Sequence, residues 1–361
     1  MKATQQLHHD GQSLWLDNIT RDLLTTGTLH RYIEDLGITG LTSNPTIFDH
    51  AFKSTAAYDA GIAKAAGRGL DEEEIFFEQA LEDLRVAADL FWPVWERTHG
   101  VDGWVSLEVS PRIAYDPEST LRAAIDLHAK AKRPNLFIKI PATAEGNPAI
   151  EEAIFAGVPV NVTLLFSREQ YVAAADAYLR GIERRVDVGL DPFVGSVASV
   201  FVSRWDTAHE STERPDDLHN QLGIAMAKRT YKAYRELLDS DRWRRLANEG
   251  ARPQRLLWAS TGTKDSAASD VLYVRALAAP FTVNTLPEKT LLAFGDHGIV
   301  GDFLPTDGGD AEDVIARFTA AGVDVDALAG RLQQEGADSF VASWDELVDN
   351  IGHKTSALTA A

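Results

Sequence analysis

Short apolar segments with β-strand character alternate with longer helical segments from residue 13 to about residue 287. This alternation is typical of β/α units that build a parallel sheet. Eight such segments can be counted, at residues 13–18, 38–44, 103–110, 135–142, 159–166, 196–203, 255–261 and 281–287. Eight strands without a break in the alternation favour a closed (β/α)8 TIM barrel over an open doubly wound sheet.

The segments between the strands have the spacing of amphipathic helices. Residues 71–92 carry apolar side chains at helical intervals, and Asp71 with Glu74 forms a capping-box pattern at their start. A second helix is expected at residues 333–351. Since no glycine- or proline-rich linker interrupts the chain, we expect one α/β domain over residues 1–361, with a barrel core at about 13–295 and a helical extension at about 296–361.

Composition excludes several classes of partner and chemistry. The chain has 54 acidic and 35 basic residues, a formal net charge of −19, which disfavours nucleic acid and anionic membranes as partners. No apolar segment approaches the roughly 20 residues of a membrane span, and the first residues do not resemble a signal peptide. The absence of cysteine removes thiolate catalysis and cysteine-bound zinc and fits a reducing compartment. We therefore expect a cytoplasmic protein.

A lysine stands in the middle of one predicted strand, in the segment LFIKIPA. Side chains alternate between the two faces of a strand, so Leu136, Ile138 and Ile140 share one face, while Phe137 and Lys139 share the other. The more apolar face packs against the helices of a barrel. Lys139 is therefore expected inside the barrel.

Three other predicted strands carry polar residues in the same phase. SLWLDN turns Asp17 inward, WVSLEVS turns Glu108 inward, and VNVTLL does so with Asn161 and Thr163. Any one of these could be an ordinary buried polar group with a satisfied hydrogen bond. Together with Lys139, however, they would be costly to bury without a function. The set predicts an active site at the carboxyl ends of the strands.

A buried lysine and nearby carboxylates suit one kind of chemistry. A neutral amine attacks a ketone and forms an iminium, which accepts the electrons of an adjacent C–C bond as that bond breaks, while a carboxylate moves protons. The ten histidines lack metal-ligand spacing, so no metal ion and no organic cofactor are expected.

Two segments resemble the signature segments of transaldolases. They are TSNPTIF at residues 42–48 and LFIKIPATAEG at residues 136–146. With LWLDN, VSLEVSP, NVTLLFS, SVFVSR and WASTGTK in the same order, the resemblance covers nearly the whole barrel and is to the longer-chain bacterial type. It implies transfer of a dihydroxyacetone unit from sedoheptulose 7-phosphate or fructose 6-phosphate to glyceraldehyde 3-phosphate or erythrose 4-phosphate, in the non-oxidative pentose phosphate pathway.

The resemblance also implies residue roles. Lys139 forms the imine with the ketose phosphate, and Asp17 is the general acid and base at the C–C cleavage. Glu108 works with Thr163 through a bound water. Asn44 and Asn161 bind hydroxyls of the retained three-carbon unit. In addition, Asn44 followed by proline suits a helix start.

The phosphate site is implied by SVFVSR, which aligns Ser199 and Arg204 with the family's ligands. The segment DPFVGS at residues 191–196 looks similar but offers no arginine, and we reject it. Ser260 corresponds to a further phosphate ligand. The widespread form of the family has an arginine two residues later, where this chain has a glycine, so Lys264 is the expected substitute, as a point charge and not a bidentate fork.

Two other functions remain open at this stage. The first is a fructose-6-phosphate aldolase, which releases free dihydroxyacetone. The resemblance places tyrosine at position 201 in those aldolases and phenylalanine in transferases, so Phe201 favours transfer. The second is a sugar-phosphate sensor without turnover, against which the intact Lys139, Asp17 and Glu108 argue. The sequence does not choose between a monomer and a homodimer.

Overall fold

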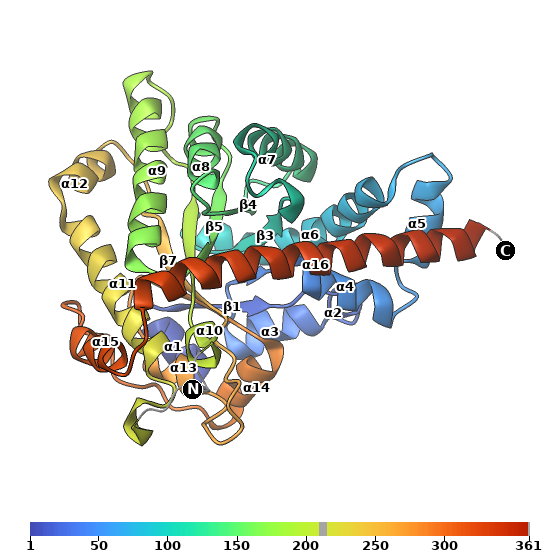
Figure 1. Ribbon diagram of the computed structural model, residues 1–361. Coiled ribbons are helices and arrows are strands. Elements are labelled where there is room, and N and C mark those ends of the chain that lie inside the picture. Colours follow the sequence, from blue (N-terminus) through green and yellow to red (C-terminus); the bar gives the residue numbers. More distant parts are fainter. Residues whose placement is uncertain (209–214, 360–361) are drawn as a thin grey trace.

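A computed structural model describes residues 1–208 and 215–359. Eight parallel strands pair in chain order and close into a barrel, which confirms the predicted (β/α)8 fold (Figure 1). The strands are β1 (Ser13–Asp17), β2 (Gly40–Thr42), β3 (Trp104–Glu108), β4 (Leu136–Pro141), β5 (Val160–Leu165), β6 (Ser196–Phe201), β7 (Arg255–Ala259) and β8 (Val283–Leu286). Every strand lies within a predicted segment. All eight are shorter than predicted, because the ladder of hydrogen bonds ends before the predicted segment does.

The alternation of side chains along the strands separates two apolar clusters. Leu16, Leu107 and Ile138 belong to the larger cluster, which includes the buried side chains of the surrounding helices. Trp15 and Phe137 belong to the other, which combines inward side chains of the strands with apolar residues of the C-terminal helices. The predicted phase of the strands is therefore confirmed.

A layer of aromatic rings fills the barrel toward the amino ends of its strands. The ring of Phe137 stacks on Trp104 with 4.0 Å between centroids and faces Trp15 at 6.2 Å. Gly40 on β2 makes room for this layer, since a Cβ there would lie 2.7 Å from the Trp15 indole. With this layer filled by rings, a ligand can enter the barrel only from the carboxyl ends of the strands.

Helices surround the barrel and follow the strands in sequence (Figure 1). They are α1 (Ala3–His9), α2 (Arg21–Thr25), α3 (Thr28–Leu36), α4 (Pro45–Ser54), α5 (Asp59–Ala66), α6 (Glu72–Arg97), α7 (Pro117–Ala131), α8 (Gly146–Phe155), α9 (Arg168–Asp187), α10 (Ser203–Thr207), α11 (Leu222–Asp239), α12 (Asp241–Asn248), α13 (Leu272–Ala276), α14 (Glu288–His297), α15 (Ala311–Ala320) and α16 (Val325–Thr359), with 3-10 turns η1 (Pro111–Ile113) and η2 (Asp216–Leu218). Among the described residues, no helix is both long and apolar enough to cross a membrane.

Helix α6 is longer than its sequence pattern predicted. The capping box is confirmed, with the Asp71 side chain accepting from the Glu74 N–H and the Glu74 side chain accepting from the Asp71 N–H. The helix continues past its predicted end at residue 92, however, and includes Pro93. Trp92 and Trp95 flank this proline in the sequence, and their rings stack on each other with centroids 4.8 Å apart. This contact joins the helical residues before and after the proline.

Helix α16 runs across the barrel as one long rod (Figure 1). Its predicted part, residues 333–351, is only the middle of the observed helix. The helix contacts α4, α5, α6 and the end of β5, so it covers the face at which the strands end. The Gln333 amide donates to the carbonyl oxygens of Ala142 and Leu164, at 3.0 Å and 2.9 Å, which ties the helix to the ends of β4 and β5.

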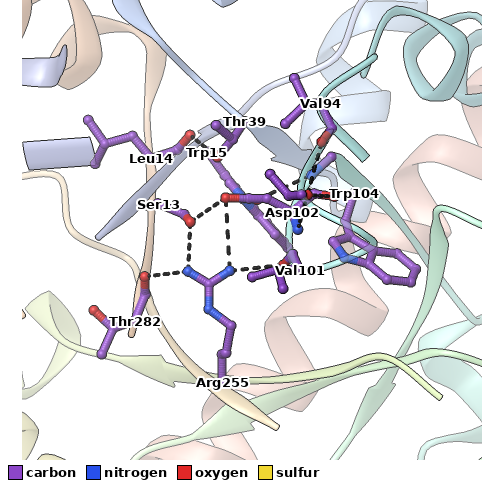
Figure 2. Close-up of polar contacts among 12 residues, drawn as sticks. Ser13, Leu14, Trp15, Thr39, Val94, Val101, Asp102, Trp104, Arg255 and Thr282 are labelled. Atoms are coloured by element: carbon purple, nitrogen blue, oxygen red, sulfur yellow. Dashed lines mark hydrogen bonds and ion pairs between the residues drawn. The ribbon is translucent and has the colours of Figure 1, made fainter. Parts of the chain in front are cut away.

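The opposite end of the barrel is closed by a buried polar cluster (Figure 2). Arg255 donates to the Ser13 hydroxyl at 2.6 Å and to the Thr282 carbonyl at 2.9 Å. Asp102 accepts hydrogen bonds from Ser13 and from the Trp15 indole, and one of its oxygens lies 3.9 Å from the Arg255 guanidinium. These residues come from the amino ends of β1, β7 and β8 and from the loop before β3. The cluster therefore links the strands where no ligand enters.

We expect Asp102→Ala to lower the free energy of unfolding by about 3–5 kcal/mol, because the substitution leaves the Arg255 charge buried without its carboxylate. Chemical denaturation measures this loss. Binding or activity at the carboxyl ends of the strands should be kept, since the cluster lies at the far end of the barrel. Asp89→Ala is the matched control, because the Asp89–Arg133 pair is exposed and a surface pair contributes little. Equal effects of the two substitutions would contradict a structural role for the buried cluster.

Candidate functional site

A cavity of about 250 Å³ opens at the carboxyl ends of the strands, beneath α16. Nine of the eleven predicted site residues line it: Asp17, Asn44, Lys139, Thr163, Ser199, Phe201, Arg204, Ser260 and Lys264. The remaining two, Glu108 and Asn161, are buried beside Lys139 on the neighbouring strands, in register with it. The structure thus brings the predicted residues together at one place.

Lys139 lies on β4, and its side chain is 7% exposed. Its ammonium donates to Glu108 Oε2 at 2.9 Å and to the Ser43 carbonyl at 3.4 Å. The ring of Phe340 from α16 lies over the amine, with the centroid 5.4 Å from Nζ. The lysine is therefore held by a carboxylate on one side and covered by an aromatic ring.

Asp17 stands at the end of β1 in the same cavity. Its Oδ1 accepts a hydrogen bond of 2.7 Å from the Thr42 hydroxyl. Burial raises the pKa of this carboxyl, although the Thr42 hydrogen bond and the charges of Lys139 and Lys264 act in the opposite direction. A carboxylate whose pKa is raised is a stronger base than a solvent-exposed one, which suits it to take a proton from a substrate hydroxyl.

Glu108 and Thr163 each present a buried oxygen to the interior. Glu108 Oε1 and Thr163 Oγ1 have no hydrogen-bond partner among the described residues. Burial raises the pKa of Glu108, and the Asp17 charge adds to this, whereas the ion pair with Lys139 opposes it. Both oxygens keep the capacity to bind another polar group.

The side chain of Asn161 is completely buried, and within the described part of the chain its amide bonds to other barrel side chains. Its Nδ2 donates to Ser106 at 3.1 Å, and its Oδ1 accepts from the Ser199 hydroxyl at 2.7 Å. The nitrogen and the oxygen of the Asn161 amide therefore each have a hydrogen-bond partner within the barrel. The predicted direct contact of Asn161 with a substrate stays a prediction.

Asn44 caps α4 as its sequence context predicted. Its Oδ1 accepts from the Ile47 N–H at 3.0 Å, and Pro45 occupies the first helical position. The cap uses the oxygen of the amide, so the NH₂ group is the part available to a ligand.

The lining of the cavity also includes two cationic side chains and a hydroxyl: Arg204, Lys264 and Ser260. The guanidinium of Arg204 lies over the Phe201 ring at 5.5 Å. Ser260 directly follows β7 with a left-handed backbone, φ 54°, and its hydroxyl is 2.9 Å from that of Ser203. A left-handed conformation is strained for serine and is common at functional sites. The arrangement offers positive charge and hydroxyl donors to an anion.

Sequence reasoning missed several residues that line the cavity. Phe340 belongs to the far C-terminal helix, and nothing in its local pattern indicates that this helix crosses the barrel. Thr285 lies on β8, and its inward phase could have been read from the same alternation that revealed Lys139. Thr42 lies in the signature segment, but its partner Asp17 is not evident from it.

No group of three histidine, cysteine, aspartate or glutamate side chains in the described ranges is arranged to hold a metal ion. The cavity is lined by the amine of Lys139, the carboxyl of Asp17, several hydroxyls and the basic side chains of Arg204 and Lys264. These are groups for imine chemistry on a substrate that carries an anion.

Comparison with known proteins agrees with this chemistry. Residues 14–351 match the family model described as Transaldolase/Fructose-6-phosphate aldolase. The chain is 46% identical over 363 residues to the transaldolase of Thermobifida fusca, which covers 98% of this chain and 99% of that protein. It is 45% identical over 353 residues to the transaldolase of Saccharopolyspora erythraea, covering 96% of each chain. The chain therefore belongs to the transaldolase/fructose-6-phosphate aldolase family.

Proposed function

We propose that this chain is a transaldolase that moves a dihydroxyacetone unit from a ketose phosphate to an aldose phosphate through an imine on Lys139. The single observation that carries this proposal is the buried Lys139–Glu108 pair in a cavity that also contains Asp17. Full-length relatives named transaldolase support the overall reaction.

The first step joins the substrate to the enzyme. Glu108 takes a proton from the ammonium, and the neutral amine adds to the ketone carbon of the substrate. Protonation of the resulting hydroxyl releases water and leaves the iminium. The partnerless oxygens of Glu108 and Thr163 support a water between them that carries these protons.

The second step breaks the C–C bond. Asp17 accepts the proton of the C4 hydroxyl, the C3–C4 bond breaks, and its electrons neutralise the iminium nitrogen to give an enamine. The aldose phosphate leaves, and another aldose phosphate takes its place. The enamine carbon then attacks the new aldehyde, Asp17 returns the proton, and hydrolysis frees Lys139.

Sugar phosphates are the substrate class that fits the cavity. Arg204 and Lys264 supply positive charge, and Ser260 supplies a hydroxyl, in the lining of the cavity that contains Lys139. Ser199, assigned to the phosphate from sequence, donates to Asn161 in the structure, so we place it nearer the three-carbon unit. We also expect the protein to act in the cytoplasm, as a monomer or a homodimer.

An acceptor-dependence assay tests the function. Fructose 6-phosphate is incubated with and without erythrose 4-phosphate, and glyceraldehyde 3-phosphate and free dihydroxyacetone are both measured. We expect sustained turnover only when the acceptor is present. Sustained release of dihydroxyacetone without acceptor would instead identify the aldolase of the same family.

The identity of residue 201 favours transfer over release. Phe201 lines the cavity and packs against Phe166, with ring centroids 5.4 Å apart. A phenyl ring has no hydroxyl to position a water against the imine. Substrate binding without any turnover in the same assay would point to a sensor.

Lys264 is expected to bind the substrate phosphate. We expect Lys264→Met to raise the KM for fructose 6-phosphate by about 10- to 100-fold, the usual loss for a hydrogen bond to a charged group. The KM for unphosphorylated fructose should change much less. Lys289→Met on α14 serves as the control, because that lysine is exposed and does not line the cavity. Equal effects of Lys264→Met on both sugars would remove Lys264 from the phosphate site.

A further inference from the structure

Two threonine hydroxyls form a short chain that ends on Asp17. Thr42 lies at the end of β2 and Thr285 on β8, and β1, which carries Asp17, pairs with both of these strands. The two hydroxyl oxygens are 2.6 Å apart, and the Thr42 hydroxyl is 2.7 Å from Asp17 Oδ1. The neighbours of β1 on either side therefore meet beside its catalytic carboxyl.

When Asp17 is ionised, the hydroxyl protons of the two threonines determine which group donates in each hydrogen bond. A carboxylate only accepts hydrogen bonds, so the single hydroxyl proton of Thr42 is donated to Asp17. The contact between Thr42 and Thr285 must then use the Thr285 proton. Thr285 donates to Thr42, and Thr42 donates to Asp17.

The bonding of these hydroxyls differs from that of an ordinary buried threonine. Such a residue usually donates to a backbone carbonyl, as Thr230 does to Met226. Thr42 and Thr285 are each 2% exposed, and their hydroxyls make no hydrogen bond to the backbone of the described chain. The backbone of Thr285 is fixed separately, since its carbonyl accepts from the Thr261 hydroxyl at 3.0 Å. The pair therefore contributes its hydroxyl groups to the carboxyl and not to the fold.

We propose that Thr42 and Thr285 are positioning residues that hold Asp17 through Oδ1 and leave Oδ2 to take the proton of the substrate hydroxyl. This inference rests on the proposed function, because it assigns the cleavage step to Asp17. Within the described chain, the hydrogen bond from Thr42 is the one that holds the Asp17 carboxyl group. Without Thr42, the carboxyl would be free to rotate and to present either oxygen.

The same hydrogen bond acts on the protonation of Asp17. Three charged groups face this carboxyl from other elements: Lys139 on β4, Lys264 after β7 and Glu108 on β3. The two lysines favour the carboxylate, whereas Glu108 and burial oppose it. A hydroxyl that donates to the carboxylate adds to the effect of the lysines, so its removal should raise the pKa of Asp17 further.

The test compares Thr42→Val, which removes the hydroxyl at nearly constant volume, with Thr42→Ser, which keeps it. We expect Thr42→Val to lower kcat for transfer by about 30- to 300-fold, a large part of what a positioned acid–base group contributes. The KM should change by less than about threefold, because Thr42 acts on the cleavage step. Thr42→Ser should keep kcat within about threefold of the wild type.

The pH profile separates positioning from simple packing. Asp17 must be ionised to accept the proton, so a higher pKa moves the acid limb of kcat/KM to higher pH. We expect this shift in Thr42→Val and, to a smaller extent, in Thr285→Val, but not in Thr42→Ser. If Thr42→Val fails to fold, Thr285→Val carries the test by the same shift.

Trapping with borohydride and fructose 6-phosphate identifies the slow step. In Thr42→Val the reduced adduct on the Lys139 peptide should be mainly the uncleaved six-carbon ketose phosphate. An unchanged kcat and acid limb in Thr42→Val would overturn the proposal, as would an equal loss in Thr42→Ser. Absence of transfer in the wild type would instead refute the proposed function, so the two failures are distinguishable.

Discussion

Lys139→Met is expected to abolish transfer, with kcat lowered by about 10⁴-fold or more, as for the loss of other covalent nucleophiles. Methionine keeps the length and the apolar stem of the side chain but has no amine to form the imine. The substitution also removes the ammonium that pairs with Glu108. A buried carboxyl without such a partner is more easily protonated. The protein should remain folded, because neutral Glu108 is tolerated in the barrel.

Lys130→Met is the control for this experiment. Lys130 lies on α7, with an exposed side chain and a surface ion pair to Asp126. Its removal should leave kcat unchanged. A Lys139→Met enzyme that keeps more than a few per cent of wild-type activity would refute the imine mechanism, provided that its circular dichroism spectrum shows a folded barrel.

Asp17→Asn is expected to have the next largest effect. An amide cannot accept the proton of the C4 hydroxyl, so kcat should fall by about 10²- to 10⁴-fold, the usual contribution of general acid–base catalysis. The amide retains the shape of the carboxyl and can still accept the Thr42 hydrogen bond. We therefore expect Lys139 to form the imine with fructose 6-phosphate but the C3–C4 bond to remain intact.

Rapid quenching during a single turnover distinguishes this outcome from a loss of binding. Glyceraldehyde 3-phosphate should appear slowly in Asp17→Asn, while the enzyme-bound ketose accumulates at nearly the wild-type rate. Cleavage at the wild-type rate would show that another group accepts the proton. Asp59→Asn on α5 is a suitable control, because Asp59 pairs with Lys354 outside the cavity.

Much of the site was predictable because a strand has a period of two. Lys139 alternates with Ile138 and Ile140 in a segment that is otherwise apolar, so burial of the apolar face determines where the amine points. The same phase placed Asp17, and both positions are observed. A barrel also brings the ends of all its strands to one face, which explains why residues far apart in sequence meet.

Contacts between distant elements were not predictable. The position of Phe340 over Lys139 depends on the path of α16, and helical periodicity does not specify what a helix packs against. The predicted helix at residues 333–351 was also too short, although Val325, Leu328, Ala329 and Leu332 before it recur at helical spacing and are buried, so the start of α16 could have been read from the sequence. Gly336 is part of this arrangement, since a Cβ there would lie 3.0 Å from the Leu164 side chain and 3.5 Å from Arg204. Glycine at this position lets α16 pass close to Arg204, which lines the cavity.

The hydrogen-bond partners within the barrel were likewise not predictable from the sequence. The family resemblance implied that Asn161 binds substrate, but the structure pairs both ends of its amide with serines, Ser106 on β3 and Ser199 on the adjacent strand β6. The Thr42–Asp17 bond depends on the stagger between β1 and β2, which the hydrophobic pattern does not fix to one residue.

The central claim is that the substrate is held as an imine on Lys139. Only an imine gives a stable secondary amine when borohydride is added together with fructose 6-phosphate, so mass spectrometry of the digested protein tests the claim directly. We predict one reduced sugar adduct, on the peptide that contains Lys139, and none when either reagent is omitted. An adduct on another lysine, or no adduct from an enzyme that is turning over, would contradict it.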